Sequence, residues 1–336
     1  MIGMMCTRFA PAAVGCILFP RCAISRSSAE RRHLVRTYRT LIIQEKRLAS
    51  RLHCLGRGFM PTIKHILFPF DFSEQGLRAA PFVRAIASRY SAKLSVMTVI
   101  PAAWNTPPGA RLPLAGLDAP EHELRARQDQ LLAEEFAGLT ACRLTDLGDP
   151  VLKIIEFAHD KGVDLIMMPT HGVSGFRSML LGSVTVQILH EAKCPVWTAT
   201  HAAKQPSSIK PSKILCAVDD SPQTGDLMRW ASEFSQQMGA ELSFLHVVSS
   251  TGDVPALASV REDVLDRLEA VKQSILIQEP LQVEAGGIAE TVTEKARQGR
   301  TDLVLIGRGL LSSPLGRLRS NAYAIIQQSP CPVLSV

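Results

Sequence analysis

The chain has no long uninterrupted hydrophobic segment and contains few aromatic residues. No apolar run approaches the ~18 residues needed to cross a bilayer, so we expect no membrane-spanning segment. Aromatic side chains make up 5% of the 336 residues, whereas hydrophobic residues together make up 46%. Such a surplus of aliphatic over aromatic side chains is typical of a parallel sheet buried between helices.

The motifs of several enzyme classes are also absent. The sequence contains no Gly-x-Ser-x-Gly nucleophile elbow, no His-Glu-x-x-His zinc pair and no Gly-Lys-Ser/Thr of a phosphate-binding P-loop. A Gly-x-Gly-x-x-Gly dinucleotide fingerprint does not follow a predicted first strand either. The sequence therefore predicts no catalytic residue and no metal site.

The cysteines do not indicate a disulfide framework. Four of the eight precede residue 60, and the body of the chain contains no Cys-x-x-Cys pair. Cys142, Cys194, Cys216 and Cys331 fall in predicted strands or directly before them, where buried thiols are expected. Free thiols are typical of a reducing compartment, so we predict a cytoplasmic protein.

Positive charge is concentrated in a leader at residues 1–59. This leader holds ten Arg, one Lys and two acids, whereas the remaining residues hold 26 basic and 29 acidic side chains. Because the body is nearly neutral, nucleic-acid binding loses its electrostatic basis. The leader has two interpretations: a targeting segment with a weak hydrophobic core at Ala12–Phe19, or an upstream start before a native Met60. In either case we expect it to be disordered or non-native, outside the fold.

Four segments of the body occur twice, in the same order. The pairs are Ile66–Ser73 with Ile214–Ser221, Ala92–Val99 with Ala240–Val247, Asp164–Ile166 with Asp302–Val304, and Cys194–Val196 with Cys331–Val333. Repetition of this kind predicts two tandem domains. We assign the first repeat to residues 60–201, the second repeat to residues 212–336, and a linker to residues 202–211.

Strand and helix patterns alternate within the first repeat. The predicted strands are Lys64–Phe70, Lys93–Ile100, Ala141–Leu147, Leu165–Met168 and Val196–Thr200. The predicted helices begin after Ser73 and at Glu121, Pro150 and Gly182, and the second of them ends at Leu139. This alternation predicts an α/β protein with two doubly wound, parallel five-stranded sheets, each covered by helices in three αβα layers.

The segment at residues 164–196 indicates a binding site. A short apolar strand is followed by a loop rich in Gly and Ser, which leads to Gly182-Ser183 at the start of a helix. Backbone N–H groups point outward at a helix start, and the helix dipole adds roughly half a positive charge. The segment therefore predicts an anion site, beyond the carboxyl ends of the strands where such sheets bind their ligands.

Through these residues the chain resembles the universal stress protein family in its tandem two-domain form. The resemblance covers residues 60–336 and rests on the Ile66–Ser73 segment, the glycine loop, and the Cys-Pro-Val that begins the last strand of each repeat. Family members that bind ATP carry Gly-x2-Gly-x9-Gly-Ser/Thr after the fourth strand. Here nine residues separate Gly172 from Gly182-Ser183, but Pro169 replaces the first glycine.

The resemblance implies a fold like that of the adenine nucleotide alpha hydrolases and of flavodoxin, with an ATP site in the first repeat. The residues implied at that site are Pro69, Asp71, Val99, Pro169, Thr170, His171, Gly172, Val173, Ser174, Gly175, Gly182, Ser183, Val184 and Thr185. Asp71 would face adenine or ribose, Val99 would form an apolar wall, and the loop and helix start would surround the phosphates. A cation such as Mg²⁺ would bridge phosphate oxygens.

Some of these residues have alternative interpretations. Asp71 could instead cap the helix that begins near Ser73, and His171 could be a solvated loop residue. Pro169 lacks an N–H, which would weaken a phosphate contact by roughly 1.5–3 kcal/mol if that N–H would otherwise face the ligand.

The second repeat departs further from the family pattern. Gly307 supplies the first glycine, but Leu310 occupies the place of the second unless Gly309 replaces it by a one-residue shift. Arg319 stands where Gly182 stands in the first repeat, and it would crowd a phosphate. The arginines that could instead meet a phosphate by charge are Arg308, Arg317 and Arg319. We expect a degenerate site in a repeat that mainly supports the first.

The function implied is that of a stress-response regulatory protein that binds ATP with little or no catalysis, at most slow hydrolysis. The alternative is a nucleotide-free interaction module that acts through its surface and dimerisation. Because the last strands of two units pair in this family, Val196–Thr200 is expected to pair with Val333–Val336 in an intramolecular pseudo-dimer. The sequence leaves open whether two chains pair further into a homodimer.

Overall fold

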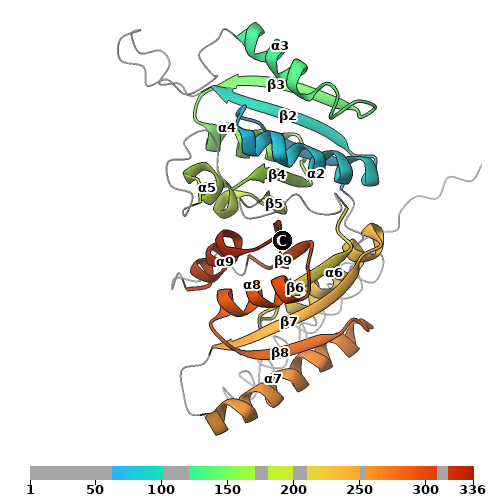
Figure 1. Cartoon of the computed structure of the whole chain (residues 1–336), viewed down its shortest axis with the longest axis vertical. Coiled ribbons are helices and arrows are strands. Elements are labelled where there is room, and N and C mark those ends of the chain that lie inside the picture. The colour runs from blue at the N-terminus through green and yellow to red at the C-terminus, as the bar shows by residue number, and fades with distance from the viewer. Residues whose placement is uncertain (1–62, 101–120, 171–180, 200–209, 250–253, 309–316) are drawn as a thin grey trace, which may run out of the picture. The chain divides into compact units, whose positions relative to one another are not determined.

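The computed structural model describes residues 63–100, 121–170, 181–199, 210–249, 254–308 and 317–336 (Figure 1). The predicted leader at residues 1–59 and residues 202–209 of the predicted linker lie outside the described residues. No helix in the described part of the chain has the length and apolar character required to cross a membrane.

Strands and helices alternate in both repeats. The first repeat contains β1 (His65–Pro69), α2 (Glu74–Tyr90), β2 (Lys93–Ile100), α3 (Glu121–Leu132), β3 (Ala141–Leu147), α4 (Pro150–Asp160), β4 (Leu165–Pro169), α5 (Ser183–Glu191) and β5 (Val196–Ala199). The second repeat contains β6 (Lys213–Ala217), α6 (Thr224–Met238), β7 (Glu241–Ser249), α7 (Val254–Ser274), β8 (Leu281–Gly286), α8 (Ile288–Gln298), β9 (Leu303–Ile306), α9 (Arg317–Gln328) and β10 (Val333–Ser335).

The ten strands in the described part of the chain belong to one sheet, in the order β3-β2-β1-β4-β5-β10-β9-β6-β7-β8. The neighbours within each repeat are parallel, as the alternation of strands and helices predicts. The two repeats meet where β10 pairs antiparallel with β5, with Val333 opposite Thr198 and Ser335 opposite Val196. The pairing expected between the last strands of the two repeats is therefore present.

Helices cover both faces of this sheet, which confirms the three-layer αβα architecture. One cluster of buried apolar residues joins the strands to α2, α3, α6 and α7. A second cluster joins them to α4, α5, α8 and α9. Inner strands such as β1 and β4 are buried on both faces, and their apolar side chains follow from that position.

Local signals determine where several helices begin. The Oγ of Ser73 accepts the N–H of Gly76 at the start of α2, and the Oδ1 of Asp149 accepts the N–H of Leu152 at the start of α4. Pro150 occupies the first turn of α4, where its missing N–H removes no intrahelical bond.

The prediction for α3 was wrong at its C-terminal end. The helix ends at Leu132, and turns follow it instead of helix up to Leu139. Gly138 has a φ of +79°, a left-handed conformation that glycine adopts easily and that does not continue a helix.

Trp197 of β5 allows a test of this packing. Its side chain is 2% exposed and its ring lies 5.1 Å from that of Phe82 in α2, measured between centroids. Trp197→Ala is expected to lower the free energy of unfolding by about 3–5 kcal/mol because it leaves a cavity. Leu152→Ala, at a side chain that is 57% exposed, is the control and is expected to stay within about 0.5 kcal/mol. Equal urea midpoints for the two variants would contradict this description of the core.

Candidate functional site

The candidate site lies at the carboxyl ends of β1, β2 and β4. The strand order changes direction between β1 and β4, because β2 follows on one side of β1 and β4 lies on the other. The register of β1 with β4 covers Ile66 and Leu67, whereas β1 stays paired with β2 as far as Pro69. Ligands of doubly wound sheets bind at such a switch point.

Asp71 lies in the sharp turn between β1 and α2. Its Oδ1 accepts the N–H of Ser73 at 3.1 Å, and Ser73 in turn caps α2. The residue between them, Phe72, has a φ of +61°, which costs a non-glycine residue about 1–2 kcal/mol. Asp71 therefore helps to hold the capping turn. Its predicted contact with a nucleotide stays a prediction, as does that of half-buried Val99.

The end of β4 holds the start of α5 through two hydrogen bonds. The N–H of Gly182 donates to the carbonyl of Thr170 at 2.9 Å, and the Oγ1 of Thr185 donates to the carbonyl of Pro169 at 3.2 Å. Pro169, Thr170 and Thr185 are buried. The N–H of Gly182 therefore already has a partner within the protein and is not available to a ligand. What Gly182 would contribute to a binding site is space, because it has no side chain.

The first turn of α5 has no side-chain cap among the described residues. Gly182 is the N-cap residue and makes no side-chain hydrogen bond, and Ser183 directly after it is exposed. The first N–H groups of a helix have no partner within the helix. The N–H groups of Ser183, Val184 and Thr185 therefore form the donor set that this helix start can present.

The backbone geometry shows which direction the nitrogen of Pro169 faces. The N–H groups of Ile166 and Thr170 both donate to β5, at the carbonyls of Pro195 and Ala199. Because successive N–H groups along a strand point to opposite sides, the nitrogen of Pro169 faces β1. Proline has no N–H, so β4 lacks one donor on the side where β1 and β4 separate.

The remaining residues implied by the family resemblance lie in the glycine loop. His171, Gly172, Val173, Ser174 and Gly175 are outside the described residues, and their positions stay predictions.

The second repeat has a hollow of about 110 Å³ at the equivalent edge of the sheet. Its lining includes Asp219, Val247 and Gly307, which correspond to Asp71, Val99 and Pro169 of the first repeat. The Oδ1 of Asp219 accepts a hydrogen bond from the Oγ1 of Thr224, so this aspartate also takes part in a capping turn.

Arg308 does not point toward a phosphate in the second repeat. Its guanidinium donates to the carbonyls of Ala192 and Cys194 in the first repeat. The suggestion that Arg308 binds a phosphate was therefore wrong, because its Nη1 and Nη2 donate to these backbone carbonyls. The side chains of Arg317 and Arg319 lie outside the described residues.

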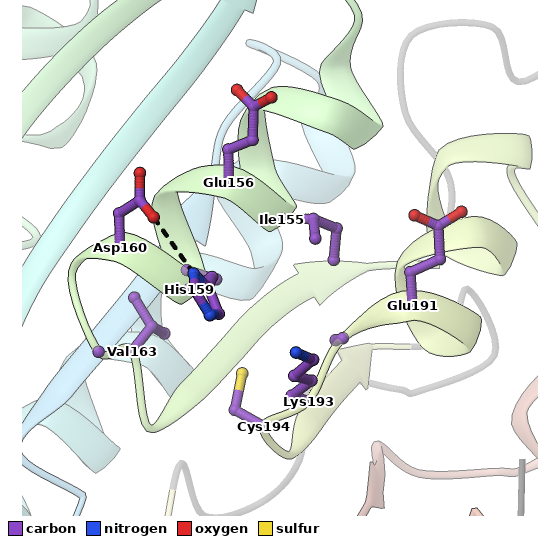
Figure 2. Close-up of a pocket in the computed structure, with 11 residues that line it drawn as sticks. Ile155, Glu156, His159, Asp160, Val163, Glu191, Lys193 and Cys194 are labelled. Carbon is purple, nitrogen blue, oxygen red and sulfur yellow. Dashed lines mark hydrogen bonds and ion pairs between the residues drawn. The ribbon is translucent and has the colours of Figure 1, made fainter.

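A larger hollow lies at the opposite edge of the sheet. This open space has a volume of about 520 Å³. Figure 2 shows the residues that line it, between the C-terminal ends of α4 and α5. Its lining includes the acidic residues Glu156, Asp160 and Glu191 around apolar side chains such as Ile155. The Nδ1 of His159 lies 3.2 Å from the Oδ1 of Asp160. No motif in the sequence indicated this hollow, because it is built from the ends of two helices that are distant along the chain.

Comparison with known proteins establishes the family. The profile of the Universal stress protein family matches residues 62–199 and 211–336. The chain therefore belongs to the universal stress protein family and carries two of its domains in tandem.

Individual relatives agree with this assignment. A universal stress protein of Methanocaldococcus jannaschii is 30% identical over 149 residues, covering 42% of this chain and 85% of the relative. A universal stress protein of Mycolicibacterium smegmatis is 24% identical over 290 residues, covering 81% of this chain and 96% of the relative. The crystal structure of a universal stress protein from Archaeoglobus fulgidus is 24% identical, covers 82% of this chain and 96% of its own, and superposes with a TM-score of 0.58. That structure shows the same fold.

The thiols of the described residues should differ in reactivity. Cys142 is exposed, whereas burial raises the pKa of Cys331 to about 12 and also raises that of Cys194. At pH 8 only about one Cys331 thiol in ten thousand would be the reactive thiolate. We expect iodoacetamide to modify Cys142 first, as followed by peptide mass spectrometry. Modification of Cys331 at the same rate as Cys142 would contradict its burial.

Proposed function

We propose that the first repeat is an ATP-binding domain of a stress-response regulatory protein. The observation that carries this proposal is the uncapped first turn of α5 beside the point where β1 and β4 separate. Such a turn combines unpartnered N–H groups with the positive end of a helix dipole, which favours a phosphate. Membership of the universal stress protein family supports the regulatory role.

In this proposal, different described residues contact the phosphates and the adenosine part of ATP. The N–H groups of Ser183, Val184 and Thr185 would meet the phosphates, and the exposed Ser183 would add its hydroxyl. Half-buried Asp71 and Val99, at the ends of β1 and β2, would face the adenine or ribose with Pro69 beside them. Thr170 and the loop at residues 171–175 would enclose the ribose and phosphates. Mg²⁺ would supply positive charge between phosphate oxygens.

The site favours binding over catalysis. The described residues assigned to the phosphates are Ser183, Val184 and Thr185, which contribute N–H groups and hydroxyls but no acid or base of the kind that activates a water molecule. We therefore propose a nucleotide-dependent regulator with at most slow ATP hydrolysis. We further propose that the two repeats are separate domains that form an intramolecular pseudo-dimer, which the pairing of β5 with β10 supports. A cytoplasmic location belongs to the same proposal.

Gly182→Arg tests the site directly. The wild-type protein is expected to bind Mg-ATP in the micromolar range by titration calorimetry. Because the arginine side chain would fill the approach to the first turn of α5, the variant is expected to bind at least about 100-fold more weakly, a loss of roughly 2.7 kcal/mol. Any slow release of phosphate from ATP should disappear in the same variant.

Gly287→Arg is the matched control. Gly287 is the N-cap of α8 in the second repeat, also without a side-chain cap bond, and its φ and ψ are close to those of Gly182. This control is expected to bind Mg-ATP as the wild type does. Absence of both binding heat and a thermal shift in the wild type, together with no adenine co-purifying with the protein, would favour the nucleotide-free interaction module instead.

A further inference from the structure

One side chain of the second repeat reaches helix α5 of the first. Arg308 follows Gly307 at the carboxyl end of β9, and its backbone N–H donates to the carbonyl of Val336. Its Nη1 donates to the carbonyl of Ala192, and its Nη2 donates to the carbonyl of Cys194 at 2.8 Å. Arg308 is half-buried, at the place where the two repeats meet.

These contacts hold the C-terminal end of α5. Ala192 is the C-cap residue of that helix, and the last carbonyls of a helix lack partners within it. The planar guanidinium presents two parallel donors to the two carbonyls, and its positive charge complements the negative end of the helix dipole. A second contact from the same repeat reaches the middle of the helix, where the Oη of Tyr323 donates to the carbonyl of Val186 at 3.4 Å.

Helix α5 is therefore anchored by different repeats at its two ends. The first repeat holds the N-terminal end through Gly182 and Thr185, and the second repeat holds the C-terminal end through Arg308. The helix has nine residues and is about 13 Å long, short enough to move as a rigid rod. A displacement at Ala192 is then transmitted to the first turn, where the candidate donors are.

We infer that Arg308 is a positioning residue for the phosphate-binding turn of the first repeat, so that the second repeat sets the affinity of the first for a polyphosphate. This inference rests on the proposed function. It gives the second repeat a role that needs no nucleotide of its own.

The second repeat also has a route by which it could alter this contact. Gly307 lines the hollow of about 110 Å³ in the second repeat, and Arg308 is the next residue. A Cβ on Gly307 would lie 3.1 Å from the Cδ2 of Leu227, so this strand end is closely packed against α6. A group that enters the hollow and displaces Gly307 would move Arg308 with it.

The experiment compares the affinities of Arg308→Met, Arg308→Lys and wild type for Mg-ATP and for adenosine by calorimetry, on the full chain. Arg308→Met is expected to bind Mg-ATP about tenfold more weakly, or about 1.4 kcal/mol. Adenosine has no phosphates and is expected to bind within twofold of wild type. Arg308→Lys keeps the charge but not the planar pair of donors, so an intermediate loss is expected. If Arg308→Met fails to fold, the comparison of Arg308→Lys with the wild type still tests the inference.

Arg297→Met is the control, because Arg297 is an exposed arginine of the second repeat that pairs with Glu294 in its own helix. Its affinity for Mg-ATP should equal that of the wild type. Unchanged Mg-ATP affinity in Arg308→Met would overturn the inference and leave the proposed function standing. An equal loss of Mg-ATP and adenosine binding would also overturn it, because that result indicates general damage to the site.

Hydrogen exchange separates failure of this inference from failure of the proposed function. If the wild type binds no Mg-ATP, the proposed function fails, and the positioning role is decided on the ligand-free protein. Faster amide exchange in the first turn of α5 in Arg308→Met than in wild type and Arg297→Met would support that role. Equal exchange in the three proteins would overturn it.

Discussion

The antiparallel backbone pairing of β5 with β10 is the constraint on which the rest of the structure depends. Each repeat alone would end in a short strand with unpaired N–H and C=O groups, which is an aggregation hazard. In the chain these two edges satisfy each other, and side chains reinforce them: the Oγ1 of Thr198 donates to the carbonyl of Val333, and the Oγ of Ser335 donates to that of Val196. One sheet results, and the helices beside the junction are brought together across it.

Contacts on both faces of the sheet depend on this junction. On one face Tyr90 of α2 stacks on Phe234 of α6, with ring centroids 6.3 Å apart, and the Nε of Arg89 donates to the carbonyl of Gln237. On the other face Arg308 reaches the end of α5. The candidate site in the first repeat is therefore built on a helix whose surroundings belong partly to the second, which links the function of one repeat to the folding of both.

Features that depend on neighbouring residues could be predicted from the sequence, and features that depend on contacts between distant segments could not. The strands and helix starts of the first repeat depend on local patterns, and the duplication extends them to the second repeat, so they could be predicted. The internal bonds of Gly182 and Thr185 and the partners of Arg308 could not, because they join residues far apart along the chain. From sequence alone, an arginine beside a glycine-rich loop indicates a phosphate ligand. Only the tertiary structure shows that Arg308 instead donates to backbone carbonyls of the other repeat.

The two repeats use the end of their fourth strand in different ways. In the first, the carbonyl of Pro169 accepts the hydroxyl of Thr185, so the strand end holds its own helix. In the second, Ala322 stands at the position of Thr185 and lacks a hydroxyl, while Arg308 extends to the helix of the other repeat. A duplicated domain can lose one side-chain hydrogen bond between strand and helix while another residue at the same strand end stabilises the neighbouring domain. Divergence of the second repeat then does not mean loss of function, because it places a cation at the C-terminal end of α5, whose N-terminal end belongs to the candidate site of the first repeat.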